Sequence, residues 1–396
     1  MDALNYLTGI AVILLLGILA SIIAKKLKTS NILLLIAVGL LIGNTALKEL
    51  PIFAFDPTFI IAIAIITLAI VVFDGTSQFN FRDLDELSAK GLELVLLFIL
   101  FSIIIITIIF NLFFFHFSAQ GILFGIILAV LMVATDPAST FILFGDKPNR
   151  VLQFLRVEAI INTPIMVLLP FLLIDLLQAQ GRFFTTFIEF LEPFFLQILV
   201  GIGAGMLVGT IIFRVMKRWY SENISPVAVI SSTLLAYILA ENLGGNGVLA
   251  VAVLGLLFGN TYVQKKGTLV GFSNITAYSL QILVFVLIGL FVTLPSSWLF
   301  WLASISILLG TILARYAAIV LLKLGKNKRE IMFMTLNMPK GIATAVVVLT
   351  LALLPIEGLD EVLSLTIIVM IYSLIISTIT TMHAKYFLRE AIEFKE

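Results

Sequence analysis

The sequence contains no cysteine and only two histidines, His116 and His383. These absences exclude disulfide bonds, thiolate metal sites and haem attachment, and they leave no plausible Ser/His/Asp catalytic set. Neither a zinc-protease motif nor a Walker phosphate-binding loop is present, which excludes an ATP-driven pump formed by this chain alone. We therefore expect that the chain is not an enzyme and that it needs no cofactor.

Charged residues are also scarce. Of the 396 residues, 12% are charged and 61% are hydrophobic, whereas a typical soluble domain has about 25% charged and about 45–50% apolar residues. The net charge of +1 gives no reason to expect a nucleic-acid partner. Stretches of about 20 apolar residues recur along the chain, each long enough to cross a lipid bilayer, and the alternation typical of a membrane β-barrel is missing. The sequence thus predicts an all-α polytopic membrane protein.

Apolar runs between charged residues and Pro/Gly breaks divide the chain into about 13 transmembrane helices. The first run begins close to Met1 and is followed by lysines rather than by a cleavage site, so we interpret it as a span and not as a signal peptide. The predicted spans cover about residues 4–24, 31–46, 58–78, 91–115, 119–145, 153–176, 187–213, 225–243, 246–262, 274–295, 298–322, 329–354 and 361–384.

Lysine and arginine residues test this division, because the cytoplasmic loops of membrane proteins collect them. If the N-terminus lies outside, 20 of the 24 basic residues fall in cytoplasmic loops or in the C-terminal tail, and only Lys48 and Arg182 fall in outer loops. We therefore expect a multi-pass protein of the cell membrane with its N-terminus outside and its C-terminus in the cytoplasm. The two remaining basic residues, Arg315 and Lys340, lie within predicted spans.

Two predicted spans are interrupted in the same way. Span 5 contains Ala134-Thr135-Asp136-Pro137 and span 12 contains Asn337-Met338-Pro339-Lys340-Gly341. In each, a proline that breaks the helix stands next to a charged residue. A proline within a helix removes a backbone hydrogen bond, and irregular backbone at membrane depth is tolerated only inside protein or beside a watery cavity. One break in each half suggests two inverted six-helix repeats with a site at the interrupted helices.

Ionisable residues within the spans narrow the search for this site. They are Asp74, Asp136, Glu158, Arg315 and Lys340. A charge near the bilayer centre costs about 2.5–3.5 kcal/mol or more, so such residues are usually paired or functional. Counting about 1.5 Å per residue places Asp136, Asn162 and Lys340 in one layer near the midplane. Glu158 and Asn162 share one helix face with Thr163 beside them. The sequence leaves open whether Glu158 is functional or neutralises Lys340 or Arg315.

Four motifs stand out on the predicted spans. They are Phe73-Asp74-Gly75 on span 3, Ala134-Thr135-Asp136-Pro137 on span 5, Glu158-Ala159-Ile160-Ile161-Asn162-Thr163-Pro164 on span 6 and Pro339-Lys340-Gly341 on span 12. Together, though not singly, they resemble the motifs of the monovalent cation/proton antiporters of the NhaP and eukaryotic sodium/proton exchanger type. The resemblance covers essentially the whole chain as a plan of thirteen spans.

The resemblance implies that partly unwound spans 5 and 12 cross, with their half-helix ends compensated by Asp136 and Lys340. Family members bind the ion through groups that correspond to Asp74, Thr135, Ala159 and Thr163, so a transported Na⁺ is expected at Asp74, Thr135 and Thr163. The family has an aspartate where this chain has Thr163. Glu158 and Lys340 resemble the family's structural ion pair, which leaves Asp74 and Asp136 as the titratable candidates.

The resemblance also implies a function and a division into domains. We expect a secondary active antiporter, a homodimer, that exchanges protons for Na⁺, Li⁺ or K⁺ by alternating access. An interface domain would comprise residues 1–90 and 181–296, and a core transport domain residues 91–180 and 297–396. The alternatives are a non-exchanging or regulatory homologue, favoured by Thr163, and an organic-anion transporter, which fits less well because only one basic residue lies at the crossover.

Overall fold

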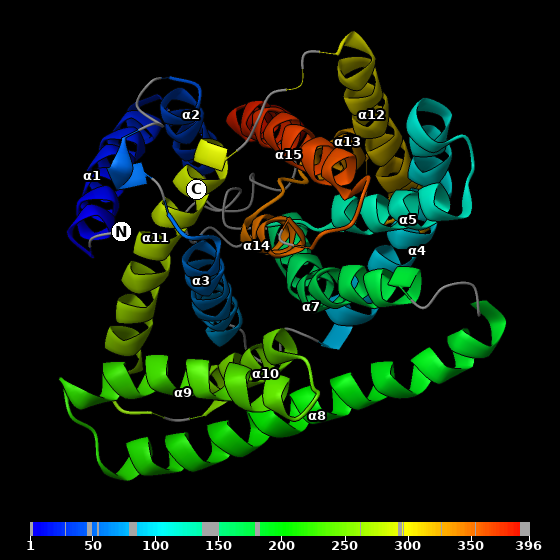
Figure 1. Ribbon diagram of the computed structural model, residues 1–396. Helices are drawn as coiled ribbons and strands as arrows, with labels where there is room; N and C mark the ends of the chain where they lie inside the picture. Colours follow the sequence, from blue (N-terminus) through cyan, green and yellow to red (C-terminus); the bar gives the residue numbers. More distant parts are fainter. Residues whose placement is uncertain are drawn as a thin grey trace. The chain divides into compact units, whose positions relative to one another are not determined.

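The computed structural model describes residues 3–388 except 28, 46–49, 54, 79–84, 137–149, 179–182, 262, 292–294, 296, 326 and 353. These residues form helices and loops, without any strand among them. The longer helices, drawn in Figure 1, are α1 (Ala3–Leu27), α3 (Pro57–Ser77), α4 (Asp85–Phe110), α7 (Arg150–Gln178), α8 (Phe183–Arg218), α9 (Ile224–Asn242), α11 (Lys266–Phe291), α12 (Trp298–Leu321) and α15 (Leu359–Met382). The shorter ones are α2 (Asn31–Gly43), α5 (Ala119–Val133), α10 (Gly247–Asn260), α13 (Lys328–Leu336), α14 (Ile342–Leu351) and α16 (Ala384–Phe387), with one-turn elements η2 (Pro51–Phe53) and η4 (Asn111–Phe115).

The all-helical membrane architecture predicted from the sequence is confirmed. Nine helices in the described part of the chain are long and apolar enough to cross a membrane. Four shorter apolar helices, α2, α5, α10 and α14, stand at the remaining predicted spans. Span 12 is divided into α13 and α14, and α8 is longer than the predicted span 7 at both ends. The thirteen predicted spans therefore each correspond to a helix or to a broken pair of helices.

The chain divides into two compact units. Unit 1 comprises residues 1–61, 87–170 and 282–396, and unit 2 comprises residues 62–86 and 171–281. The division into interface and core domains that the sequence suggests stays a prediction, and each unit is described by itself.

In unit 1, α15 is the helix against which the interrupted spans pack. It contacts α5, α12, α13 and α14, and Figure 1 shows it in red and orange beside them. Small residues let other helices of this unit approach closely. A Cβ added to Gly39 on α2 would lie 2.2 Å from the carbonyl oxygen of Val286 on α11, so only glycine fits there. Unit 1 thus holds both helix breaks and the helix that supports them.

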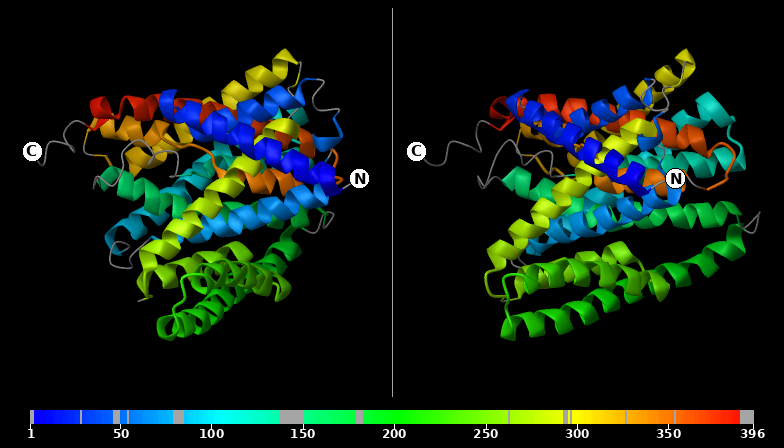
Figure 2. Two further views of the ribbon diagram at one scale, coloured as in Figure 1. Left: turned by 90° about the vertical axis from the view of Figure 1, so that its left-hand side faces the viewer. Right: turned by 60° about the vertical axis from the view of Figure 1, so that its left-hand side comes forward.

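In unit 2, α8, α9 and α10 pack on one another, and they stay together in the views of Figure 2. The described part of α3 in this unit reaches α10, where the rings of Phe73 and Phe258 lie 5.4 Å apart. Glu222 and Lys265 form an exposed ion pair between two loops. The hydrogen bond from Lys265 lowers the pKa of the Glu222 carboxyl and raises that of the Lys265 ammonium.

Candidate functional site

The two helix breaks of unit 1 contact each other through their backbones. α5 ends at Val133, and residues 134–136 follow outside any helix, while residues 337–341 separate α13 from α14. The N–H of Asp136 donates a hydrogen bond of 2.8 Å to the carbonyl of Pro339. Asp136 and Met338 each precede a proline. Residues in that position are biased away from helical backbone, which favours a helix break at both places. The predicted crossing of spans 5 and 12 is therefore present as far as Asp136; Pro137 lies outside the described residues.

Asp136 lies against the beginning of α14. A Cβ added to Gly341, the residue that caps α14, would lie 2.1 Å from Oδ2 of Asp136 and 2.3 Å from its Cβ. Glycine at this position thus allows the carboxyl group to approach the N-terminus of the helix. An anion is favourable there because the first backbone N–H groups carry a partial positive charge.

Two cations stand at the opposite, C-terminal ends of the interrupted helices. The ammonium of Lys340 donates to the carbonyl of Met132, in the last turn of α5. The Nε of Arg315 donates to the carbonyl of Met334, in the last turn of α13, at 2.8 Å. Both side chains are completely buried. Each therefore satisfies a carbonyl that the helix break leaves without an intrahelical partner, and each opposes the negative end of a helix dipole.

The structure decides which base neutralises Glu158. Arg315 donates two hydrogen bonds to its carboxylate, at 2.6 and 2.8 Å, and neither side chain is exposed. The guanidinium also lies 5.3 Å from the ring centre of Phe98. Of the two partners considered from the sequence, Arg315 is right and Lys340 is wrong. The depth in the membrane estimated from the sequence could not distinguish the two candidates, because it does not give the direction of a side chain around the helix axis.

Asn162 and Thr163 follow one turn after Glu158 on α7 and behave differently. The amide nitrogen of Asn162 donates to the hydroxyl of Thr135 at 2.8 Å and to the carbonyl of Val133 at 3.4 Å. Asn162 is completely buried, and its Oδ1 has no hydrogen-bond partner among the described residues. Thr163 is half-buried and donates to the carbonyl of Ala159 within its own helix. Within the described part of the chain, Asn162 is thus joined to Thr135, and the hydrogen bond of Thr163 is a local one within α7.

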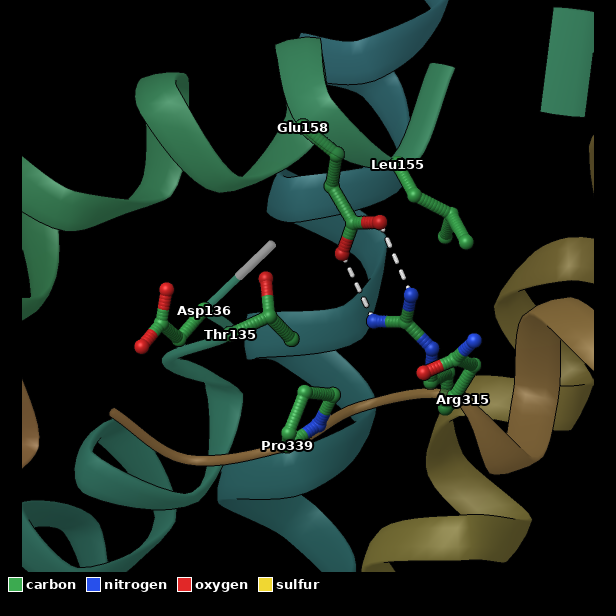
Figure 3. Close-up of a pocket in the computed structure, with 7 residues that line it drawn as sticks. Thr135, Asp136, Leu155, Glu158, Arg315 and Pro339 are labelled. Atoms are coloured by element: carbon green, nitrogen blue, oxygen red, sulfur yellow. Dashed lines mark hydrogen bonds and ion pairs between the residues drawn. The ribbon is translucent and has the colours of Figure 1, made fainter. Parts of the chain in front are cut away.

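A small pocket lies at this crossover, with a cavity volume of about 10 Å³. Figure 3 shows Glu158 and Arg315 pointing towards each other across it, whereas the carboxylate of Asp136 points away from this pair. Its lining residues are Thr135, Asp136, Leu155, Glu158, Arg315, Asn337 and Pro339. Among the described residues no group of three or more histidine or carboxylate side chains could hold a metal ion.

Residues on α15 hold the break of span 12 and were missed by the sequence analysis. The hydroxyl of Ser373 accepts a hydrogen bond of 3.1 Å from the N–H of Lys340. The hydroxyl of Ser377 donates to the amide oxygen of Asn337 at 2.6 Å, and the amide nitrogen of Asn337 donates to Thr381 at 3.5 Å. Ser373, Ser377 and Thr381 are four residues apart and thus share one helix face, which was the available signal.

Asp74 belongs to unit 2 and is described there only. It lies half-buried near the end of α3, and its Oδ2 accepts a hydrogen bond of 3.3 Å from Gln78. Next to it, a Cβ added to Gly255 on α10 would lie 2.0 Å from the hydroxyl oxygen of Thr76, so α3 and α10 are in close contact. The predicted joint site of Asp74 with Thr135 and Thr163 stays a prediction.

Similarity to known proteins identifies the family of this chain. The family described as sodium/hydrogen exchanger, transmembrane, matches residues 10–384 of this chain. The chain belongs to the sodium/hydrogen exchanger family. The structure of the sodium proton antiporter MjNhaP1 from Methanocaldococcus jannaschii at pH 8 superposes with a TM-score of 0.80 at 21% identity, covering 99% of this chain and 100% of that one. This likeness shows a shared fold.

Sequence relatives in the exchanger family bear the names of antiporters. A K⁺/H⁺ antiporter NhaP2 of Shewanella oneidensis is 29% identical over 195 residues, which are 48% of this chain and 33% of that protein. The probable Na⁺/H⁺ antiporter 2 of Methanocaldococcus jannaschii is 26% identical over 365 residues, 87% of this chain and 84% of that protein. The matches to NhaP2 proteins span between 30% and 54% of their length. These names describe the relatives.

Proposed function

We propose that this exchanger-family protein is a secondary antiporter that exchanges protons for a monovalent cation, Na⁺, Li⁺ or K⁺, by alternating access. The observation that carries the proposal is the crossing of two interrupted helices at the hydrogen bond between Asp136 and Pro339. Buried cations donate to carbonyls at the C-terminal ends of both helices, α5 and α13. Such half-helix ends are where secondary transporters bind ions near the membrane midplane. The names of the relatives support both a proton and an alkali cation as transported ions.

Asp74, Thr135 and Thr163 are the proposed cation ligands, and Asn162 and Asp136 complete the proposed site. The role of Asn162 follows from its hydrogen bond to Thr135, because that bond fixes the hydroxyl beside the end of α5. Glu158 is not proposed as a ligand, since Arg315 occupies both of its oxygens. In this proposal Asp74 supplies an anionic ligand and the threonines supply neutral oxygens, which favours weak binding of a singly charged cation.

One observation favours a second candidate, a homologue that does not exchange ions. Thr163 stands where the resembling antiporters have an aspartate, and its hydroxyl is used within α7. A carboxylate at which a proton and a cation compete is therefore missing from that position. The charged helix ends would then have only a structural role.

Purified protein in sealed vesicles distinguishes the two candidates. Vesicles containing a pH-sensitive dye and an imposed pH gradient receive Na⁺, Li⁺ or K⁺ in turn, with choline as the control cation and protein-free vesicles as the blank. The antiporter dissipates the gradient with at least one alkali cation and not with choline. Silence with all three cations, from protein that is folded and inserted, would establish the non-exchanging candidate.

A further inference from the structure

Thr344, in the first turn of α14, has a buried hydroxyl that makes no hydrogen bond. The residue is only 2% exposed, and its Oγ1 has no partner among the described residues. Most described threonines within the helices donate to the carbonyl four residues earlier, as Thr350 of the same helix does to Val346 at 2.9 Å. For Thr344 that position, residue 340, lies in the break and outside α14. Burial of this hydroxyl is therefore a cost that no described contact offsets.

The place of Thr344 on α14 directs its side chain towards the break of span 5. Gly341 caps α14, so Thr344 is the third residue of the helix. Side chains at the cap and at the third position of a helix are neighbours, because each can reach the backbone of the other. Gly341 has no side chain, and Asp136 fills that space, since a Cβ added to Gly341 would lie 2.1 Å from its Oδ2. The hydroxyl of Thr344 is thus directed to the part of the first turn that Asp136 meets.

A second oxygen without a partner meets the same break from α7. Asn162 uses its amide nitrogen on Thr135 and Val133, which leaves its Oδ1 buried and without a partner among the described residues. Among the described residues of α5, α7, α13, α14 and α15, only Asn162 and Thr344 have a buried side-chain oxygen or nitrogen in this condition. Buried polar atoms are otherwise almost always satisfied, so two such oxygens beside one short segment of backbone indicate a site that a ligand completes.

Resting on the proposed antiport function, we propose that Thr344 is a further ligand of the transported cation. The first turn of a helix presents backbone N–H groups, which repel a cation, so a ligand on that turn must be a side-chain oxygen. Ile342, Ala343 and Ala345 have no such oxygen, whereas Thr344 has one. A hydroxyl group rotates freely enough to turn its lone pairs towards a cation. The bound ion thus gains a neutral oxygen from α14 and links this half-helix to the break of span 5.

The test compares Thr344→Val, which keeps the shape of the side chain and removes the hydroxyl, with Thr344→Ser, which keeps the hydroxyl. Proton flux in vesicles is measured as a function of the concentration of NaCl, LiCl or KCl. Thr344→Val should raise the concentration for half-maximal flux by at least about tenfold, because a contact between a polar group and an ion commonly contributes that much. Its maximal flux should change little, and Thr344→Ser should keep the parental value. A hydroxyl with only a structural role would not separate the two variants in this way.

Thermal unfolding in detergent distinguishes a ligand from a structural group. In choline chloride, Thr344→Val should unfold at the parental temperature or above it, since it removes a buried polar group that has no described partner. On addition of an alkali cation that the parent exchanges, its unfolding temperature should rise less than that of the parent. Thr350→Val is the matched control on the same helix. It loses the bond to Val346, so it should lose stability and keep the parental cation affinity.

Each outcome of these measurements decides one question. If valine does not fit at position 344, Thr344→Ser and Thr344→Ala, which differ by one hydroxyl, make the same comparison. Parental half-maximal concentrations in the variants without the hydroxyl would overturn the role of Thr344 and leave the proposed antiport intact. The same conclusion would follow from a lower unfolding temperature of Thr344→Val in choline with unchanged cation affinity. A parent that is neither stabilised by any alkali cation nor able to exchange one would instead overturn the proposed function.

Discussion

Arg315 holds both carboxylate oxygens of Glu158, at 2.6 and 2.8 Å, and neither side chain has any exposed surface. The same guanidinium donates to the carbonyl of Met334. One residue of α12 therefore fixes α7 and the end of α13 at once. This side chain thus neutralises Glu158 and also helps to position the break of span 12.

Removing one member of this pair should be far worse than removing both. Arg315→Leu leaves a buried carboxylate unpaired, which we expect to lower the free energy of unfolding by about 3–5 kcal/mol. Glu158→Leu/Arg315→Leu should recover much of this loss, because no buried charge is then left unpaired. Arg214→Leu, at an exposed position on α8, is the control and should change stability little. The measurement is the unfolding temperature in detergent; equal losses in the single and double variants would contradict the pairing.

Gly341 should tolerate no side chain. A Cβ at this position would lie 2.1 Å from Oδ2 of Asp136, so Gly341→Ala must displace the carboxyl group or the backbone, at a cost of about 1–3 kcal/mol. We expect loss of stability together with loss of proton flux. Gly203→Ala on α8 is the matched control, since nothing lies within 4 Å of its added Cβ. Stability there should be unchanged or higher by about 0.5–1 kcal/mol.

The sequence predicted the helix breaks and their charges for identifiable physical reasons. Hydrophobic length predicted the spans, and proline beside an ion predicted irregular backbone at positions 134–137 and 337–341. The helical repeat also placed Glu158 and Asn162 on one face, and both are completely buried. These features depend on local sequence alone.

The contacts between helices could not be predicted in the same way. Arg315 and Lys340 were both possible partners of Glu158, and their different orientations around two helix axes decided the matter. The contact of Ser377 with Asn337 likewise depends on which face of α15 meets the break. Periodicity gives a face for each helix but not the neighbour that this face meets.

The membrane orientation predicted from the distribution of basic residues can be tested by labelling. The chain has no cysteine, so single cysteines introduced at Thr45 and Lys328 report on one position each. Both positions are exposed. Thr45 follows the end of α2, next to the predicted outer loop that contains Lys48, and Lys48 itself lies outside the described residues. A membrane-impermeant thiol reagent should label Thr45→Cys from outside and Lys328→Cys only after the membrane is opened. Labelling of both from one side would rule out thirteen spans.

Asp136 should be essential for exchange and dispensable for insertion. Asp136→Asn keeps the shape of the side chain against Gly341 and removes its negative charge. The charge at the N-terminus of α14 is then lost, and the crossover gains a net positive charge that disfavours a bound cation. Proton flux should fall at least about tenfold, with the protein still recovered from membranes as a folded species. Parental flux in this variant would show that the charge of Asp136 is only structural.

Thr163→Asp should strengthen cation binding, because it adds a negative charge to the proposed site. The proposed ligands that belong to unit 1, Thr135, Thr163 and Thr344, are all neutral. Thr163 is half-buried, and its hydroxyl donates to the carbonyl of Ala159 within α7, a local bond that the substitution removes. A carboxylate near the bound ion also competes for protons, since desolvation favours its neutral form. We expect apparent cation affinity to rise by at least about tenfold and the pH dependence of flux to shift. Thr163→Asn, which has the same shape without the charge, is the matched control and should resemble the parent. Tighter binding by both variants would show that shape, and not charge, limits the affinity.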